Sequence, residues 1–230
     1  MQRGCLASGL SSPVKTKSSR PSLQDQVFKI EAAGSTLPDK TRPNQRNCKM
    51  LDWFTSRSRY RRKAEELYGA VVAAARQPAL FSQGGIPDTP EGRFEAVALF
   101  LFLAVDRLQR EGADGERMGQ RLIEVFVTDM DDNLREMGVG DLSVPKKVQR
   151  ATNAFYERAL AYRAGLKAAD SDELAAALTQ FVYKGSPSAR AGQLGHYVRN
   201  VAARLAQIPS VDASAGQLTF LPFHVTEAIT

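Results

Sequence analysis

The stretch Thr128-Asp-Met-Asp-Asp-Asn-Leu-Arg-Glu-Met-Gly-Val-Gly-Asp-Leu-Ser-Val-Pro-Lys-Lys-Val-Gln-Arg150 decides the fold, because it contains the end of one helix, a turn and the start of another. Gly138 is placed to adopt the left-handed conformation that ends many helices. Ser143 is placed to cap the following helix, and Pro145 falls in its first turn, where a missing N–H costs nothing. We therefore expect a rigid corner, with acidic residues before the turn and basic residues after it.

Apolar side chains recur every three or four residues on both sides of this corner, which predicts amphipathic helices. The run Ala96–Val105 is apolar on nearly all sides, so its helix should be central, and it is too short to cross a bilayer. Asp88 or Thr89 is placed to cap that helix. The predicted helices cover about 60–75, 90–109, 116–137, 144–166, 171–182 and 189–207. The predicted fold class is therefore all-α, a single domain of about six helices.

Some features of the third and fourth predicted helices are more specific. Gly112 and Gly115 are expected to break the chain before the third helix begins. The apolar face of the third helix runs from Leu122 to Met137 and should face the core. The fourth helix should place Phe155 and Tyr162 inward, with Arg158 beside them.

The basic charge of the chain lies at its N-terminal end. The formal net charge is +6, and residues 1–49 carry all of it, while residues 50–230 are neutral. A nucleic-acid domain concentrates basic charge on its own surface, so we expect no DNA partner. We expect residues 1–49 to be disordered, residues 50–210 to form the helical domain and residues 211–230 to form an extended tail. Three interpretations of residues 1–49 are open: a targeting segment, a flexible tail, or an extension that precedes the true start at Met50. We favour the last.

No catalytic or metal-binding motif is complete in this sequence. The acidic run Asp129–Asn133 fails as a calcium loop, because Leu134 stands where glycine is expected and Gly140 where glutamate is expected. Both cysteines, Cys5 and Cys48, precede the helical domain. No nucleophile elbow or phosphate-binding glycine loop occurs. We therefore expect no cofactor, no metal and no enzymatic activity.

Three segments together resemble the ubiquinol–cytochrome c chaperone family, whose members assist assembly of the cytochrome b–c1 complex (respiratory complex III). They are Pro87–Glu95, Asp129–Asp141 with Val144–Lys147, and Ala154–Arg158 followed by Tyr162. Their order and spacing also match the family, over roughly residues 67–204. The chain departs from the family at Glu157, where glycine is common, and at Phe100, where a histidine is frequent in the central helix.

The resemblance implies a chaperone that binds newly made cytochrome b, or another b–c1 subunit, before haem and partner subunits are incorporated. It implies a place in the bacterial cytoplasm at the inner membrane, or alternatively in the mitochondrial matrix, with peripheral membrane contact. The expected client-binding residues are Asp88, Arg93, Arg135, Asp141, Lys146, Tyr156 and Arg158. The corner is expected to hold Arg135 and Asp141 near Arg158.

Two other functions remain open at this point. Short basic clusters touch anionic lipid or ribosomal RNA, so the chain could be a ribosome-binding adaptor that acts through Arg57, Arg59, Arg61, Arg62 and Lys63. The acidic helix also suggests a magnesium-dependent helical enzyme acting on an isoprenoid or quinone-like substrate. Asp129 and Asp132 would then bind the metal.

Overall fold

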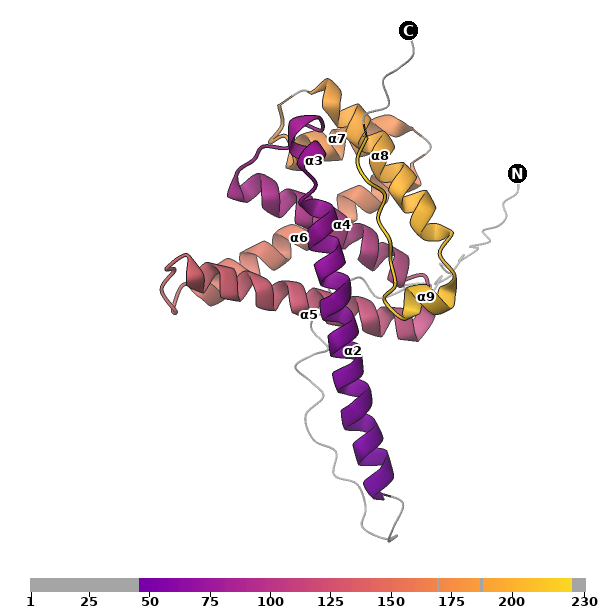
Figure 1. Cartoon of the computed structure of the whole chain (residues 1–230). Coiled ribbons are helices and arrows are strands. Elements are labelled where there is room, and N and C mark those ends of the chain that lie inside the picture. Colours follow the sequence, from indigo (N-terminus) through magenta and orange to yellow (C-terminus); the bar gives the residue numbers. More distant parts are fainter. Residues whose placement is uncertain (1–45, 169, 187, 225–230) are drawn as a thin grey trace, which may run out of the picture. The chain divides into compact units, whose positions relative to one another are not determined.

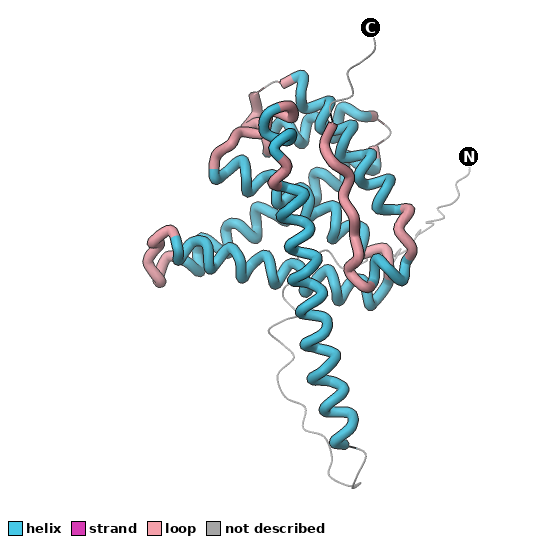
Figure 2. Tube along the Cα trace, viewed as in Figure 1, coloured by secondary structure: helices cyan, strands magenta, loops and turns pink. Residues whose placement is uncertain are grey.

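The computed structural model describes residues 46–168, 170–186 and 188–224 and places eight helices within them (Figure 1). These residues contain helices and loops but no strand (Figure 2), which confirms the predicted all-α class. Most of the N-terminal extension predicted for residues 1–49 lies outside the described residues. The helices are α2 (Arg46–Ala75), α3 (Pro78–Ser82), α4 (Pro90–Leu108), α5 (Gly112–Glu136), α6 (Val144–Lys167), α7 (Ser171–Phe181), α8 (Ala189–Ala206) and α9 (Ser210–Ser214). The short helices α3 and α9 were not predicted.

Helix α4 is the central element of the core, as its apolar sequence predicts. It contacts α2, α5, α6 and α8, and every residue from Ala98 to Leu108 is buried. The Phe102 ring packs against Tyr162 of α6, and the Phe100 ring packs against Tyr197 of α8. Burying a large apolar side chain contributes about 1.5–3 kcal/mol, so this helix fixes the positions of the elements around it.

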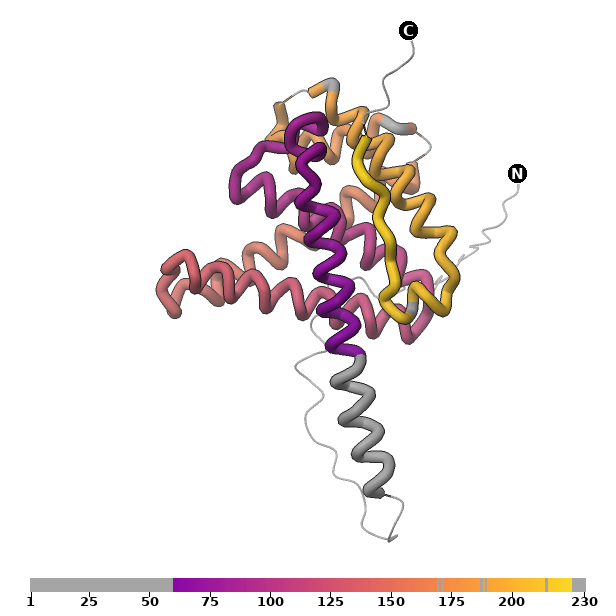
Figure 3. Tube along the Cα trace, viewed as in Figure 1, coloured from indigo at the N-terminus to yellow at the C-terminus, as the bar shows by residue number. Residues whose placement is uncertain are grey.

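The tail predicted as extended over residues 211–230 instead begins with helix α9, and residues 217–224 then run as a chain without helix or strand beside α8 (Figure 3). Residues 225–230 lie outside the described residues. The Tyr197 hydroxyl donates a hydrogen bond to the carbonyl of Leu221, at 2.6 Å. The backbone N–H of Phe223 donates to the side-chain oxygen of Gln77, at 2.7 Å, and the Phe223 ring packs edge-on against Tyr197. The tail therefore connects α8 to the residues after α2 through hydrogen bonds between its backbone and the side chains of Tyr197 and Gln77.

The corner between α5 and α6 ends α5 as predicted. Gly138 has a φ of 76°, and the N–H of Val139 bonds to the carbonyl of Leu134, which completes a Schellman motif. The capping role predicted for Ser143 is wrong, because its side chain makes no capping bond. Its own N–H and that of Val144 instead bond to the carbonyl of Gly140. A tight backbone turn therefore leads into α6 without a side-chain cap.

The chain break predicted at Gly115 is also wrong. Gly115 is buried within α5, where an added Cβ would lie 2.2 Å from the carbonyl oxygen of Leu108. Glycine is needed there because α5 and the end of α4 approach closely, and the residue does not interrupt the helix. Gly112, with a φ of 68°, does mark the separation of α4 from α5.

A second close approach at Gly165 gives a prediction for stability. An alanine Cβ at this position of α6 would lie 2.6 Å from the Cα of Leu174 in α7, and a backbone atom cannot rotate away. We expect Gly165→Ala to lower the free energy of unfolding by about 1–3 kcal/mol, measured by urea denaturation. Gly69→Ala in α2 meets nothing within 4 Å and should instead stabilise by up to about 1 kcal/mol. Equal changes in the free energy of unfolding of the two variants would contradict the close packing of α6 against α7 at Gly165.

Candidate functional site

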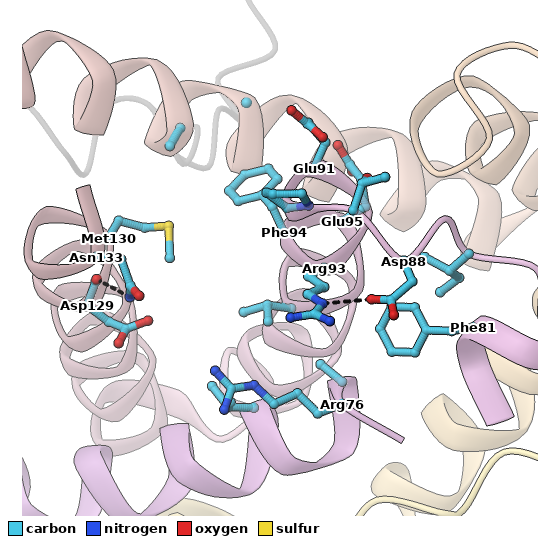
Figure 4. A pocket seen from close by; sticks show the side chains of 18 of the residues that line it. Arg76, Phe81, Asp88, Glu91, Arg93, Phe94, Glu95, Asp129, Met130 and Asn133 are labelled. Atoms are coloured by element: carbon cyan, nitrogen blue, oxygen red, sulfur yellow. Dashed lines mark hydrogen bonds and ion pairs between the residues drawn. The ribbon is translucent and has the colours of Figure 1, made fainter. Parts of the chain in front are cut away.

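A groove of about 1580 Å³ lies between five elements: α2, α3 with the loop after it, the start of α4, the second half of α5 and the first half of α6. Much of its lining is apolar, contributed by Val72, Phe81, Ile86, Phe94, Val97, Met130, Leu134 and Met137. Figure 4 shows charged side chains pointing into the same space, among them Arg76, Arg93 and Asp129. The groove therefore combines an apolar floor with charged walls.

The three segments singled out in the sequence meet at this groove. The first lies more than 30 residues before the other two along the chain, yet each contributes to the lining. Segment Pro87–Glu95 contributes seven lining residues at the start of α4, and segment Asp129–Asp141 contributes five on α5. On α6, the lining includes Lys147 from the end of the second segment, and Ala154 and Arg158 from the third. The convergence of all three makes the groove the candidate functional site.

The start of α4 presents an exposed ion pair at the edge of the groove. The Thr89 hydroxyl caps the helix by accepting from the N–H of Gly92, at 3.1 Å. Asp88 is therefore available to accept from Nε of Arg93, at 2.8 Å. This hydrogen bond lowers the pKa of the Asp88 carboxyl. Both side chains are largely exposed, so the pair contributes little to stability.

A buried ion pair joins α4 to α6 beneath the groove. Arg158 donates two hydrogen bonds to the Glu95 carboxylate, from Nε and Nη2, each at 2.6 Å. Its guanidinium also lies over the rings of Phe94 and Phe181, 5.7 and 4.8 Å from their centroids. Burial alone would lower the pKa of Arg158, but the Glu95 hydrogen bonds and charge raise it. The cation therefore stays charged and fixes the spacing of α4 and α6.

Two carboxylates of the acidic run on α5, Asp129 and Asp131, accept hydrogen bonds from side chains of this chain. The Tyr68 hydroxyl donates to Oδ2 of Asp129, at 2.8 Å, and Arg135 pairs with Asp131, at 2.6 Å. Burial and the bond to Asp129 raise the pKa of Tyr68, so its hydroxyl remains a donor. Within the described part of the chain, no three histidine, cysteine or carboxylate side chains gather as a metal site.

The structure separates the predicted client-binding residues into two places. Asp88, Arg93 and Arg158 line the groove. Arg135 and Asp141 instead pair with each other at the exposed corner, at 2.6 Å. Arg158 lies 14 residues beyond Val144 along α6, a rise of about 21 Å. The expectation that the corner holds Arg135 and Asp141 near Arg158 is therefore wrong.

Two further predicted residues, Lys146 and Tyr156, also do not line the groove. Lys146 is exposed in the first turn of α6, and Tyr156 is half-buried with its ring packed against Phe155. Neither side chain is on the face of α6 that carries Lys147 and Arg158. Their predicted role in client binding has no support from the groove.

The predicted basic run lies on α2. Side chains are described from Tyr60 onward, so those of Arg57 and Arg59 lie outside the described residues. Arg61 pairs with Glu65 at 3.4 Å, and Arg62 pairs with Glu66 at 3.5 Å; both pairs are exposed. The neighbouring Lys63 is half-buried. Two of the cations are thus partly neutralised along their own helix.

Several groove residues were missed or misplaced by the sequence reasoning. Lys147, Arg150 and Ala154 were not selected, yet they share one helix face with the predicted Arg158. The period of α6 therefore carried a signal that could have identified them. Met137 was assigned to the core, but its side chain is 67% exposed and lines the groove. The apolar stripe of α5 thus continues beyond the core and becomes a groove wall.

Among the residues that the structure describes, no helix combines the length and the apolar character needed to cross a bilayer.

Curated relatives of the chain are proteins named as assembly factors. The mouse protein named ubiquinol-cytochrome c reductase complex assembly factor 1 is 29% identical over 138 residues, 59% of this chain and 46% of that protein. The human protein of the same name is 28% identical over 165 residues, 71% of this chain and 53% of that protein. The chain thus spans about half the length of these curated relatives.

A solved structure and a family profile also match the chain. The crystal structure of the Cbp3 homolog from Brucella abortus is similar, with a TM-score of 0.67 and 35% identity, over 75% of this chain and 96% of that one. The profile of the family described as ubiquinol-cytochrome C chaperone matches residues 82–220, more than half of the chain and most of the groove lining. The chain therefore belongs to the ubiquinol–cytochrome c chaperone family.

Proposed function

We propose that this chain is an assembly chaperone for the cytochrome b–c1 complex, and that its groove binds newly made cytochrome b before haem and partner subunits are added. The convergence of the three family-like segments on one groove is the observation that carries the proposal. An apolar floor between helices suits a polypeptide that would otherwise expose apolar surface. The role is one of binding and not of catalysis.

We place this role at the inner membrane surface, bacterial or mitochondrial, where a respiratory complex is assembled. The two other functions gain no comparable support. Asp129, which a magnesium-dependent enzyme would use, accepts a hydrogen bond from Tyr68 instead. The cations Arg61 and Arg62, which a ribosome-binding adaptor would use, are paired along α2.

Deleting the gene in its own organism tests the proposal. We expect the assembled b–c1 complex, measured on native gels, and the b-type haem absorbance of membranes to fall to background. Re-expression of the intact chain should restore both. Succinate dehydrogenase activity serves as the control, because a general defect of the membrane would lower it too. Unchanged b–c1 activity in the deletion strain would refute the proposed function.

A further inference from the structure

Three of the cationic side chains that line the groove have no carboxylate partner within the described part of the chain. Five cationic side chains line it, and Arg93 and Arg158 pair with Asp88 and Glu95. The other three are Arg76, Lys147 and Arg150, and none has a carboxylate within 4.0 Å among the described residues. The three come from two different walls, since Arg76 follows α2 and the others lie on α6.

The carboxylates of the groove are engaged locally. Asp129 accepts from the Tyr68 hydroxyl at 2.8 Å. The backbone N–H groups at the start of α4 and the neighbouring Thr89 hydroxyl lower the pKa of the Glu91 carboxyl. Together with the Asp88 and Glu95 pairs, three of the four carboxylates of the lining accept a side-chain hydrogen bond. Asp129 and Glu91 keep their negative charge, because their donors are neutral, so the lining has a net charge of +1. Arg76, Lys147 and Arg150 are its cations without an ion-pair partner among the described residues.

The volume of the groove is comparable to that of a short helix. An α-helix with its side chains is about 10 Å across and rises about 1.5 Å per residue. A volume of about 1580 Å³ thus corresponds to a segment about 20 Å long, or three to four turns. A helix in this position would contact Phe81, Phe94 and Met130 with an apolar face, the usual mode of helix-in-groove recognition.

We propose that the groove selects a client helix that carries acidic side chains on both flanks of an apolar face. Arg76 on one wall, and Lys147 with Arg150 on the other, would pair with those two flanks. Lys147 and Arg150 are three residues apart on α6 and so present neighbouring charges along one flank. The inference rests on the proposed function, because it states the chemistry of the segment that the same groove receives.

A membrane surface fits these observations less well than a helix does. Anionic headgroups lie in one plane, whereas the three cations come from two walls with apolar side chains between them. A lipid surface that reached all three would have to enter a space bounded by five elements. A single polypeptide helix meets both walls without deforming.

Two synthetic helical peptides of about 16 residues test the inference against the full chain. They share one Leu/Ala face and carry either glutamate or lysine on both flanks. We expect fluorescence anisotropy at about 50 mM salt to show the glutamate peptide binding about tenfold more tightly, with the preference shrinking at about 300 mM salt. The double variant Lys147→Glu/Arg150→Glu should reverse the preference.

A matched control separates the groove from general charge effects. Lys147→Glu should weaken the glutamate peptide several-fold, whereas Lys146→Glu, one residue away and outside the groove lining, should leave its affinity unchanged. Thermal unfolding of each variant reports whether it remains folded. Equal affinity for both peptides would overturn the inference, as would equal effects of the two variants. Binding to phosphatidylglycerol vesicles that depends on Lys147 and Arg150, without any peptide preference, would also overturn it.

The outcomes distinguish this inference from the function on which it rests. If peptide selection fails but gene deletion still removes the b–c1 complex, only the chemistry of the client helix is wrong. If peptide selection holds but deletion leaves the complex intact, the proposed function is wrong and the groove serves another client.

Discussion

Replacing Arg158 by methionine is expected to lower the free energy of unfolding by about 3–5 kcal/mol, because the change leaves the Glu95 carboxylate buried without its partner. The two side chains are only 15% and 8% exposed, so water cannot take over the two hydrogen bonds. The substitution also removes the guanidinium from the faces of Phe94 and Phe181. Chemical denaturation monitored by circular dichroism measures the loss.

Two comparison variants show whether burial is the cause. Arg93→Met breaks the Asp88 pair, whose side chains are 65% and 60% exposed, and should cost less than about 1 kcal/mol. The double variant Glu95→Gln/Arg158→Met removes the stranded charge and should recover part of the stability lost in Arg158→Met. Similar losses for Arg158→Met and Arg93→Met would mean that the α4–α6 pair is no stronger than a surface pair.

The architecture was largely predictable because its signals are local. The apolar run Ala96–Val105 indicates a helix that must be surrounded, and the structure buries it at the centre. Gly138 indicates a left-handed helix end, and it has that conformation. The prediction for Gly115 was wrong because glycine is required there by the nearby carbonyl of Leu108. This is a contact between two helices, and the spacing of residues in the sequence does not reveal it.

The candidate site was predictable only in part, because its central ion pair joins residues 63 positions apart. Asp88 and Arg93 are close in sequence, and their pairing could be anticipated. Glu95 lies within a quoted segment but was not selected, although a glutamate directly before a buried apolar run must find a cation. That rule predicts a partner for Glu95, but it does not identify Arg158, which is 63 positions away.

The groove itself also had a recognisable signal in the pattern of α5. The core buries Leu122 and Phe126, but the same apolar stripe continues through Leu134 to Met137. A stripe longer than the core can cover leaves apolar surface for a partner. Sequence alone could not show where the core ends, because that depends on how far α2 and α6 extend over α5.

Met137 and Leu142 allow the groove to be tested against the corner beside it. Both are exposed apolar residues, at 67% and 94%, and they are five positions apart, but only Met137 lines the groove. A photo-crosslinking amino acid at position 137 should form a covalent product with newly made cytochrome b in cells. The same amino acid at position 142 should not. A product formed at 142 but not at 137 would assign client contact to the corner.

The matched substitutions Met137→Gln and Leu142→Gln test whether the groove residue, and not the corner residue, is needed for client binding and assembly. Neither side chain belongs to the core, so the free energy of unfolding should change by less than about 0.5 kcal/mol in both variants. Met137→Gln should weaken client binding about tenfold, or about 1.4 kcal/mol, because a large apolar side chain no longer joins the interface. In the deletion strain, Leu142→Gln should restore the b–c1 complex fully. Met137→Gln should restore only a fraction of it, measured by native gels at matched expression, and full restoration by both variants would exclude Met137 from the client site.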